Sequence, residues 1–133
     1  MITFNFQNKT FLNFLAHLYL SENNTHILLG NFIADHITGN NFTHFHPEIQ
    51  KGILLHREID TFTDAHKIVR KSKRRLHPRY RHYKGVIIDI FYDHYLAKNW
   101  ISYSDVPLET FVQSVYDLLQ NNFDILPKKT QHL

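Results

Sequence analysis

The stretch Tyr80–Trp100, YRHYKGVIIDIFYDHYLAKNW, decides between a helical and a mixed fold. Its β-branched run Val86-Ile87-Ile88 is typical of a strand. The stretch holds no proline, however, and its apolar residues at 87, 90, 91, 95 and 96 recur at the spacing of one helix face. We therefore predict one long helix here and an all-α protein.

Helical patterns also precede this stretch. The spacing predicts a short, almost entirely apolar helix at 11–20 and a helix at about 25–38, with Asn24 or Thr25 as its N-cap and Gly39-Asn40 as its end. A third helix runs from about Pro47 to Asp60, with a break or bend at 61–63. We expect Asp64 to cap a basic helix at 65–76, which Pro78 ends.

The last predicted helix begins at Pro107 and carries an apolar stripe over 108–119. We expect a frayed tail after Asn122. No repeat and no hairpin signal interrupts this pattern. The sequence thus predicts a single-domain helical bundle over 1–133, with an extension at 1–11, a helical core at 12–122 and a tail at 123–133.

The composition limits the possible functions. The chain has 133 residues, of which 43% are hydrophobic and 20% charged, enough for one compact core. It has no cysteine, so a metal ion would have to be held by His, Asp, Glu or Asn. No apolar run has the length of a membrane span, and the first ten residues do not resemble a signal peptide. We expect a cytoplasmic protein that does not enter a membrane.

Positive charge is concentrated in Lys67–Lys84, KIVRKSKRRLHPRYRHYK, which holds nine of the 15 Lys and Arg residues and no acid. Such a segment attracts an acidic protein, nucleic acid or a phosphorylated ligand, although a solvated helix face would look the same. Only Tyr80 and Tyr83 interrupt it with aromatic rings, so we consider nucleic acid unlikely. The expected partner-binding residues are Arg70, Lys71, Lys73, Arg74, Arg75, Arg79 and Arg81.

Four of the predicted helices carry polar pairs four residues apart. These are His56 with Asp60 and Asp64, Asp89 with Asp93, Asn31 with Asp35, and Asn13 with His17. Carboxylates among apolar residues need a cation or hydrogen-bond donors. Ordinary salt bridges and helix caps would meet that need, but together the pairs favour a site for Mn²⁺ or Mg²⁺. Such a site indicates metal-assisted hydrolysis of a phosphate ester, and the chain lacks the motifs of P-loop, serine-elbow and Rossmann enzymes.

Four segments carry a family resemblance. They are NFLAHLYLS at 13–21, GNFIADHITG at 30–39, GILLHREIDTFTD at 52–64 and DIFYDHYLAKNW at 89–100, and in this order they resemble the acyl carrier protein phosphodiesterases. The resemblance implies an all-helical fold distantly related to the HD phosphohydrolases, and Mn²⁺ as cofactor. It also implies hydrolysis of the phosphodiester that joins 4′-phosphopantetheine to a serine of holo acyl carrier protein.

The resemblance places functional residues on these segments. We infer Asp35, His56, Asp60 and Asp93 as metal ligands and Asp89, His94 and His17 as supporting or acid and base groups. Arg57 would stabilise charge on the phosphoryl group. The basic segment would bind the acidic carrier protein.

The family resemblance also implies two differences in length. Members usually begin near the position of Leu12 and continue for some sixty residues beyond the end of this chain, so the bundle and its activity could be incomplete. The last apolar stripe would then favour pairing with a second copy. Two alternatives stay open, namely a metal phosphohydrolase with a small-molecule or nucleotide substrate, and a non-catalytic module that binds an acidic partner.

Overall fold

The structure is a computed structural model that describes residues 14–21 and 23–132, and every regular element in these ranges is helical. This confirms the predicted all-α fold. The α-helices are α1 (Leu15–Leu20), α2 (Thr25–Ile33), α3 (Pro47–Ala65), α4 (Lys67–Tyr80), α5 (Lys84–Lys98), α6 (Leu108–Asn121) and α7 (Lys128–Gln131). Single 3₁₀ turns are η1 (Ala34–His36), η2 (Arg81–Tyr83), η3 (Trp100–Ser102) and η4 (Phe123–Ile125). None of the described helices has the length and hydropathy needed to cross a membrane.

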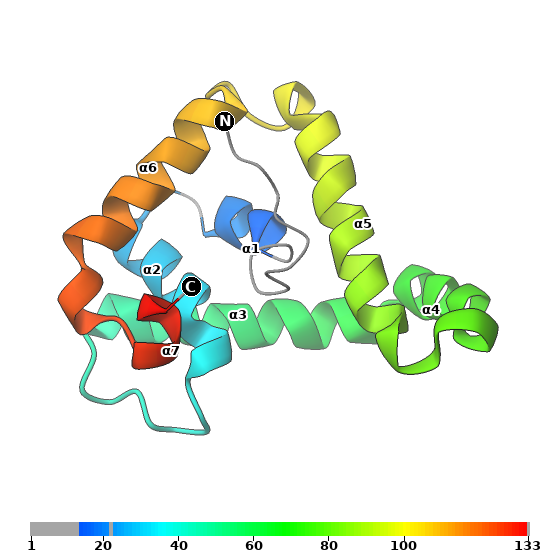
Figure 1. Ribbon diagram of the computed structural model, residues 1–133, viewed down its shortest axis with the longest axis horizontal. Coiled ribbons are helices and arrows are strands. Elements are labelled where there is room, and N and C mark those ends of the chain that lie inside the picture. Colours follow the sequence, from blue (N-terminus) through cyan, green and yellow to red (C-terminus); the bar gives the residue numbers. More distant parts are fainter. Residues whose placement is uncertain (1–13, 22, 133) are drawn as a thin grey trace.

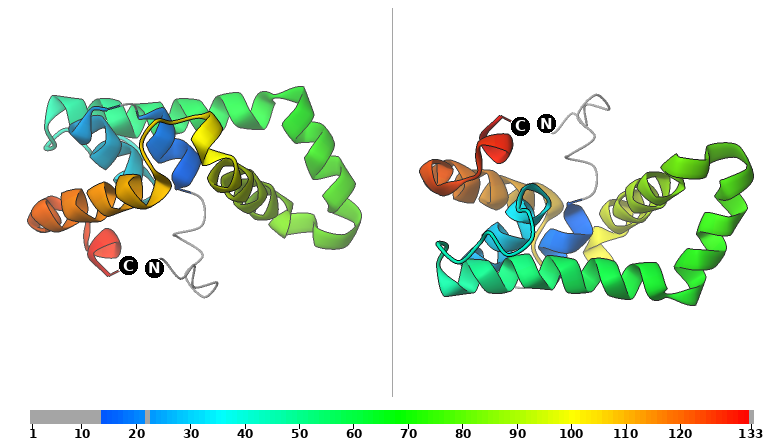
Figure 2. Two further views of the ribbon diagram at one scale, coloured as in Figure 1. Left: turned by 90° about the horizontal axis from the view of Figure 1, so that it is seen from above. Right: turned by 90° about the horizontal axis from the view of Figure 1, so that it is seen from below.

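The helices form a triangular frame around α1 and α2. In the view of Figure 1, α3 runs along the bottom, α5 and α6 lie on opposite sides and α1 lies between them, while Figure 2 shows that α4 separates the end of α3 from the start of α5. The two views of Figure 2 show α4 and the turn into α5 projecting from one end of the molecule. The core therefore lies on the side of α1, α2 and α6, and the basic segment lies away from it.

Helices α2 and α3 are in close contact, because two glycines face each other there. A Cβ added to Gly30 would overlap the carbonyl oxygen of Ile49, and one added to Gly52 would overlap that of Ile27. Without these side chains the two backbones approach closely. This contact fixes the second half of α2 beside the first half of α3, one turn before His56.

The core is formed mainly by these helices. Its buried apolar residues are Phe14, Leu18, Leu28, Leu29, Phe32, Ile33, Ala34, Ile49, Ile53, Val115 and Leu126. The stripe of α6 faces this core, since Phe111, Leu118 and Leu119 pack against it. Part of the stripe that we expected to favour pairing with a second copy is therefore packed within the same chain.

The helix boundaries around the basic segment differ from the prediction. Helix α3 runs without a break through residues 61–63, and the cap of α4 is His66, whose Nδ1 accepts a hydrogen bond from the backbone N–H of Ile68. Asp64 is thus not a cap. Pro78 lies inside α4 and does not end it; the helix continues for two more residues, to Tyr80.

Two further predictions need correction. The long helix expected over 80–100 begins only at Lys84, because η2 and the left-handed backbone of Arg81 (φ +40°) turn the chain first. The segment after Asn122 is not frayed. Leu126 and Thr130 are buried there, and the Thr130 hydroxyl lies 2.6 Å from Nδ1 of His36.

Candidate metal centre

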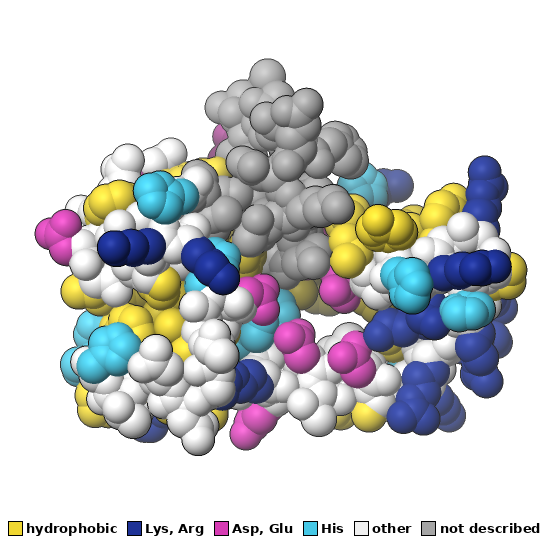
Figure 3. Space-filling model, turned by 60° about the horizontal axis from the view of Figure 1, so that its bottom comes forward, with side chains coloured by type: hydrophobic (Ala, Val, Ile, Leu, Met, Phe, Trp, Pro, Cys, Tyr) yellow, Lys and Arg dark blue, Asp and Glu magenta, His cyan; other side chains and the backbone are white. Residues whose placement is uncertain are grey.

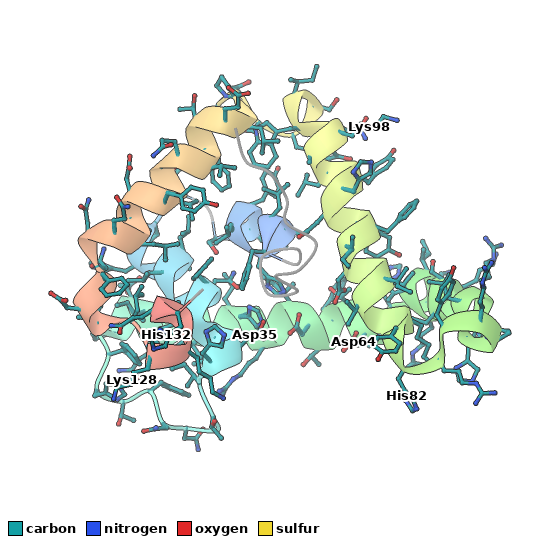
Figure 4. All side chains as sticks on the ribbon, in the orientation of Figure 1. Asp35, Asp64, His82, Lys98, Lys128 and His132 are labelled. Atoms are coloured by element: carbon teal, nitrogen blue, oxygen red, sulfur yellow. The ribbon has the colours of Figure 1, made fainter. Side chains whose placement is uncertain are left out.

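Side chains from α1, η1 and α3 meet at one point beside the middle of α3. They are His17 of α1, Asp35 of η1, and His56 and Asp60 of α3. In Figure 4, Asp35 lies next to the middle of α3, whereas Asp64 lies near the end of that helix that leads to α4. These four residues are a candidate site for a metal ion, and we refer to them as the metal centre.

The two histidines and two carboxylates of the metal centre are in direct contact. His56 Nε2 lies 3.0 Å from Oδ1 of Asp35 and 3.3 Å from Oδ2 of Asp60. His17 Nε2 lies 3.0 Å from Oδ1 of Asp60. The His56 contact with Asp60 confirms that residues four apart share one face of an unbroken helix here.

Asn31 of α2 fixes which nitrogen of His56 faces the carboxylates. Its amide nitrogen donates to the backbone oxygen of His17 and to Oγ of Ser21, at 2.8 Å each. Its Oδ1 must therefore accept from His56 Nδ1, at 2.9 Å. With the hydrogen of Nδ1 used in this way, Nε2 is the nitrogen that the carboxylates or a cation would share.

The rings of the two histidines lie face to face. Their centroids are 3.9 Å apart and their planes differ by 13°. Nδ1 of His17 is buried and has no hydrogen-bond partner among the described residues. Two stacked rings whose Nε2 atoms meet the same carboxylate are a poor arrangement for two imidazolium charges. These two nitrogens and the carboxylates would instead suit a divalent cation.

The pKa values of the metal centre follow from these contacts. Burial acts to lower the pKa of His56, but its hydrogen bonds to Asp35 and Asp60 outweigh burial and raise the pKa to about 9. The hydrogen bond from His56 lowers the pKa of Asp35. Burial acts to raise the pKa of Asp60, but hydrogen bonds from both histidines hold it below its ordinary value. Both carboxylates are thus charged near neutral pH.

The donor set fits a divalent cation. One ligand atom each from His17, His56 and Asp60 lie within 4.8 Å of one another, and Asp35 adds an oxygen beside His56. Imidazole nitrogen and carboxylate oxygen are ligands that Mn²⁺ accepts. The histidine side chains are 13% and 5% exposed, whereas the Asp35 and Asp60 side chains are 54% and 53% exposed. A substrate could therefore reach the carboxylate side of the metal centre.

The structure does not bring Asp93, which we predicted as a metal ligand, into the metal centre. Its two carboxylate oxygens accept the backbone N–H groups of Leu15 and Ala16, at 3.0 Å each. Burial raises its pKa to about 6, although the two N–H groups act to lower it. Asp93 thus anchors the start of α1, the helix that carries His17.

Asp89 and His94, predicted as acid or base groups, take different places on α5. Burial and the nearby charges of Asp60 and Asp64 raise the pKa of Asp89, so this carboxylate lies within electrostatic reach of the metal centre. His94 is exposed. Asp89 is exposed as well, and what relates it to the metal centre is the charge of Asp60, which acts to raise its pKa.

Arg57 is engaged by the loop that follows η1. Its guanidinium donates to the carbonyl oxygens of Gly39, at 2.7 Å, and Ile37, at 3.5 Å. It also lies 5.4 Å from the centre of the Phe42 ring. These contacts tie α3 to the loop that carries the chain away from Asp35.

The predicted partner-binding residues gather on one part of the surface. Figure 3 shows Lys and Arg side chains clustered over α4, beside a row of acidic side chains. All seven lie on α4 or η2, and each is exposed except Lys73, which is half-buried. Lys73 bonds Asp64 at 2.9 Å, so this surface begins where the acidic side of α3 ends.

Sequence reasoning paired Asn31 with Asp35 but did not predict its contact with His56, and it did not single out Ser21. Both are buried, at 0% and 1% exposure, and their hydrogen bonds connect His56 to the backbone of α1. The available signal was an amide inside the apolar stretch ILLGNFIA, four residues before Asp35. A buried amide must find partners, and the partners here come from two other segments.

The described part of the chain is thus an all-helical protein with a His and Asp cluster suited to a divalent cation. Residues 12–133 match the family of acyl carrier protein phosphodiesterases, and the chain belongs to that family. This confirms the resemblance in the four sequence segments.

Two relatives illustrate the match. A protein of Pectobacterium atrosepticum is 35% identical over 123 residues, which cover 92% of this chain and 64% of the relative. One of Salmonella agona is 38% identical over 102 residues, which cover 76% of this chain and 53% of the relative. Both are named acyl carrier protein phosphodiesterase. The chain therefore spans between half and two thirds of the length of these relatives. No solved structure matches it.

Proposed function

We propose that this chain hydrolyses holo acyl carrier protein to apo-protein and 4′-phosphopantetheine, with Mn²⁺ held by the metal centre. The observation that carries the proposal is the convergence of His17, Asp35, His56 and Asp60 from three separate elements. Membership of the acyl carrier protein phosphodiesterase family supports the choice of substrate. The cytoplasmic setting, a role in fatty acid biosynthesis and any homo-oligomer stay predictions.

In this reaction a water oxygen bonds to phosphorus while the bond from phosphorus to the serine oxygen breaks. A divalent cation bound here supplies positive charge that stabilises the developing phosphoryl charge and makes water easier to deprotonate. Asp35 and Asp60 present half-exposed carboxylates on the side where the phosphodiester would bind. His56 is held by Asn31 so that Nε2 points to the same place.

The leaving serine oxygen needs a proton, and Asp89 is the residue that we propose for this step. Burial and its two acidic neighbours favour its protonated form more than in an ordinary aspartate. Asp93 would act indirectly, because it holds the start of the helix that carries His17. For Arg57, stabilisation of phosphoryl charge stays a prediction.

The basic surface on α4 and η2 would bind the carrier protein. The family resemblance implies an acidic partner, and opposite charges on two proteins speed and orient their association. The surface adjoins Asp64 through Lys73. A partner bound over α4 could thus extend its modified serine along α3 toward Asp60.

The proposed function is tested by mass spectrometry of holo acyl carrier protein incubated with the chain and Mn²⁺. We expect the carrier protein to lose its phosphopantetheine arm. Asp60→Asn should slow this loss by about 100-fold or more, since it removes a ligand charge. The matched control is Glu58→Gln, an exposed acid on α3 outside the metal centre, which should hydrolyse at the wild-type rate.

The same experiment separates the alternatives. An intact arm together with turnover of a simple phosphodiester would favour a small-molecule phosphohydrolase. Binding of the carrier protein without hydrolysis of either compound would favour a non-catalytic module. Equal rates for Asp60→Asn and wild type would contradict the assignment of the metal centre.

A further inference from the structure

A second polar site lies at the corner where α4 turns through η2 into α5. A hollow of about 690 Å³ opens there between Lys73 and His77 of α4, Arg81 of η2, and Lys84 and Gly85 of α5. An adjoining hollow of about 720 Å³ shares Lys73, His77 and Lys84 and is extended by Arg70 and Arg74. We call the first hollow the corner pocket.

The described residues that line the corner pocket carry positive charge that no acidic residue among them balances. Among the residues that the structure describes, no Asp or Glu lines either hollow, and Lys73 alone of the lining cations has an acidic partner, Asp64. Cations that face a shared cavity repel one another. An anion in the corner pocket would relieve this repulsion.

The hydrogen bond between His77 and Lys84 leaves both side chains with N–H groups that can donate to a ligand. The ammonium group of Lys84 lies 2.8 Å from Nδ1 of His77, and because an ammonium group can only donate, Nδ1 accepts. The ring hydrogen of His77 is therefore on Nε2, where it can bond an anion. Two hydrogens of the Lys84 ammonium group also stay available for a ligand.

One residue at the corner pocket, Arg81, has a backbone conformation that is unusual for a residue other than glycine. Arg81 has φ +40° and ψ −104°, a conformation that side-chain-bearing residues rarely adopt. It sits where the chain reverses from α4 to α5 and brings the Arg81 side chain to the pocket wall. Residues held in such conformations are concentrated at ligand-binding sites.

Gly85 leaves one side of the corner pocket open. A Cβ added there would meet only the Lys73 side chain, at 4.0 Å, so an anion can approach the first turn of α5. The positive end of the helix dipole adds to the attraction at this turn. Cationic donors thus come from α4, η2 and α5 together.

We propose that the corner pocket is a binding site for a phosphate group, separate from the metal centre and independent of the proposed hydrolysis. A phosphate dianion offers several oxygens to donors that converge from three elements, whereas a carboxylate offers two oxygens and one charge. The phosphate could be free or part of a phosphomonoester. An extended acidic surface would instead contact α4 broadly without selecting the corner pocket.

The test is calorimetric titration of the full chain with inorganic phosphate and with 4′-phosphopantetheine, in EDTA so that no divalent cation contributes. The pocket variant is Arg81→Gln with Lys84→Gln. The matched control is Lys71→Gln with Arg75→Gln, which removes the same charge from exposed α4 residues that line neither hollow. We expect the pocket variant to weaken phosphate binding about tenfold or more and the control about twofold or less.

A single substitution provides a second test in which all the cationic side chains of the corner pocket are kept. Gly85→Glu places a carboxylate in the corner pocket, and glutamate forms helix more readily than glycine. It should abolish phosphate binding while the circular-dichroism spectrum stays helical. Tighter binding of the ester than of phosphate would identify a phosphomonoester as the ligand.

Two results would contradict the proposal that the corner pocket binds phosphate. One is the absence of phosphate binding by the wild-type chain at about 10 mM ligand, well above ordinary cellular affinities. The other is an equal loss in the pocket and control variants, which would indicate general attraction by the basic surface. An acidic peptide that binds with the same equal loss would then identify the surface as a protein contact.

Discussion

His56 is held on both ring nitrogens, by the Asn31 amide on one side and by the Asp35 and Asp60 carboxylates on the other. Without a cation, the ring is an imidazolium that donates from both nitrogens. A divalent cation would take the place of the Nε2 proton between the same groups. Binding of a divalent cation would thus release the Nε2 proton, which gives the binding a measurable pH dependence.

Apparent Mn²⁺ affinity should rise with pH. The pKa of His56 is about 9 in the folded, cation-free protein, so below pH 9 an entering ion must displace a proton. We expect the affinity to increase about tenfold per pH unit, or about 100-fold between pH 6 and 8. Titration at three pH values measures this slope, and a change of less than about twofold would contradict it.

Cation-free stability should change in the opposite direction. His56 binds its proton more tightly in the folded chain than at its ordinary pKa of 6.5. Its contribution to the free energy of unfolding is therefore complete below pH 6.5 and is lost as pH rises through 9. Urea unfolding in EDTA at pH 6 and pH 9 should show this decline. His56→Gln should flatten it, and an unchanged slope in that variant would assign the decline to other groups.

Asn31 should control cation affinity as well as stability. Asn31→Ala leaves His56 Nδ1 and the His17 carbonyl oxygen without the amide, which costs about 1–3 kcal/mol of unfolding free energy. We also expect Mn²⁺ affinity to fall by about 10- to 100-fold. The matched control is Asn24→Ala, which removes the cap of the same helix for about 1 kcal/mol. Equal Mn²⁺ affinity in the two variants would contradict the positioning role.

For individual residues, the sequence predicted which side chains share a helix face better than it predicted their contacts with other segments. Spacing placed His56 and Asp60 on one helix face, and Asn31 and Asp35 on one helical segment, because helix geometry is local. It could not assign Asp93 to the backbone of Leu15 and Ala16, since 77 or more residues separate them. Asp60 and Asp93 each lie four residues after another polar residue of their helix. Tertiary packing then brings two histidines to Asp60 and two backbone N–H groups to Asp93.

Helix α3 is the element on which the metal centre depends, because it supplies two of the four residues and packs against the helix of Asn31. The contact rests on Gly30 and Gly52. Any side chain at either position would push α2 from α3. His56 would then separate from Asn31 before the helices themselves unfold.

Gly52→Ala should therefore destabilise the protein and weaken cation binding together. The added Cβ would overlap the Ile27 carbonyl oxygen, and overpacking of this kind costs about 1–3 kcal/mol. Gly85→Ala is the control, because it adds the same atom to a helix without a clash, at van der Waals distance from Lys73, and should raise stability by about 0.5–1 kcal/mol. Thermal unfolding measures both; a stable Gly52→Ala variant with normal Mn²⁺ affinity would contradict the account.

The spacing of apolar residues predicted which segments form helices, but it predicted less accurately where those helices end. Pro78 was expected to stop α4, yet the helix continues to Tyr80 and turns only at Arg81. The tail after Asn122 was expected to fray, but Leu126 packs in the core and Thr130 is buried beside His36. In each case a tertiary contact or a single backbone conformation overrode the local signal.

Across the whole molecule, acidic and basic groups are separated along α3 and α4. The acidic side of α3 includes Asp60 and Asp64, and positive charge begins at Lys73, which bonds Asp64. This arrangement would guide an acidic protein to α4 while a cation occupies the metal centre. The charge totals were visible in the sequence, but their adjacency depends on the turn between α3 and α4.

Association with holo acyl carrier protein should thus weaken with salt if the proposed function holds. Raising NaCl from about 50 to 500 mM shortens the screening length to a few ångströms, and we expect the Michaelis constant for the carrier protein to rise about tenfold. Hydrolysis of a small phosphodiester serves as the control and should change little. A similar response of both substrates would indicate an effect on the metal centre and not on the basic surface.

The most direct measurement of the central claim is the stoichiometry of Mn²⁺ binding, followed by electron paramagnetic resonance at neutral pH. We predict one tightly bound ion per chain, and an affinity about 100-fold lower in Asp60→Asn. Asp64→Asn, four residues further along the same helix and outside the metal centre, should bind like wild type. Absence of stoichiometric binding, or equal affinity in Asp60→Asn and Asp64→Asn, would contradict the account.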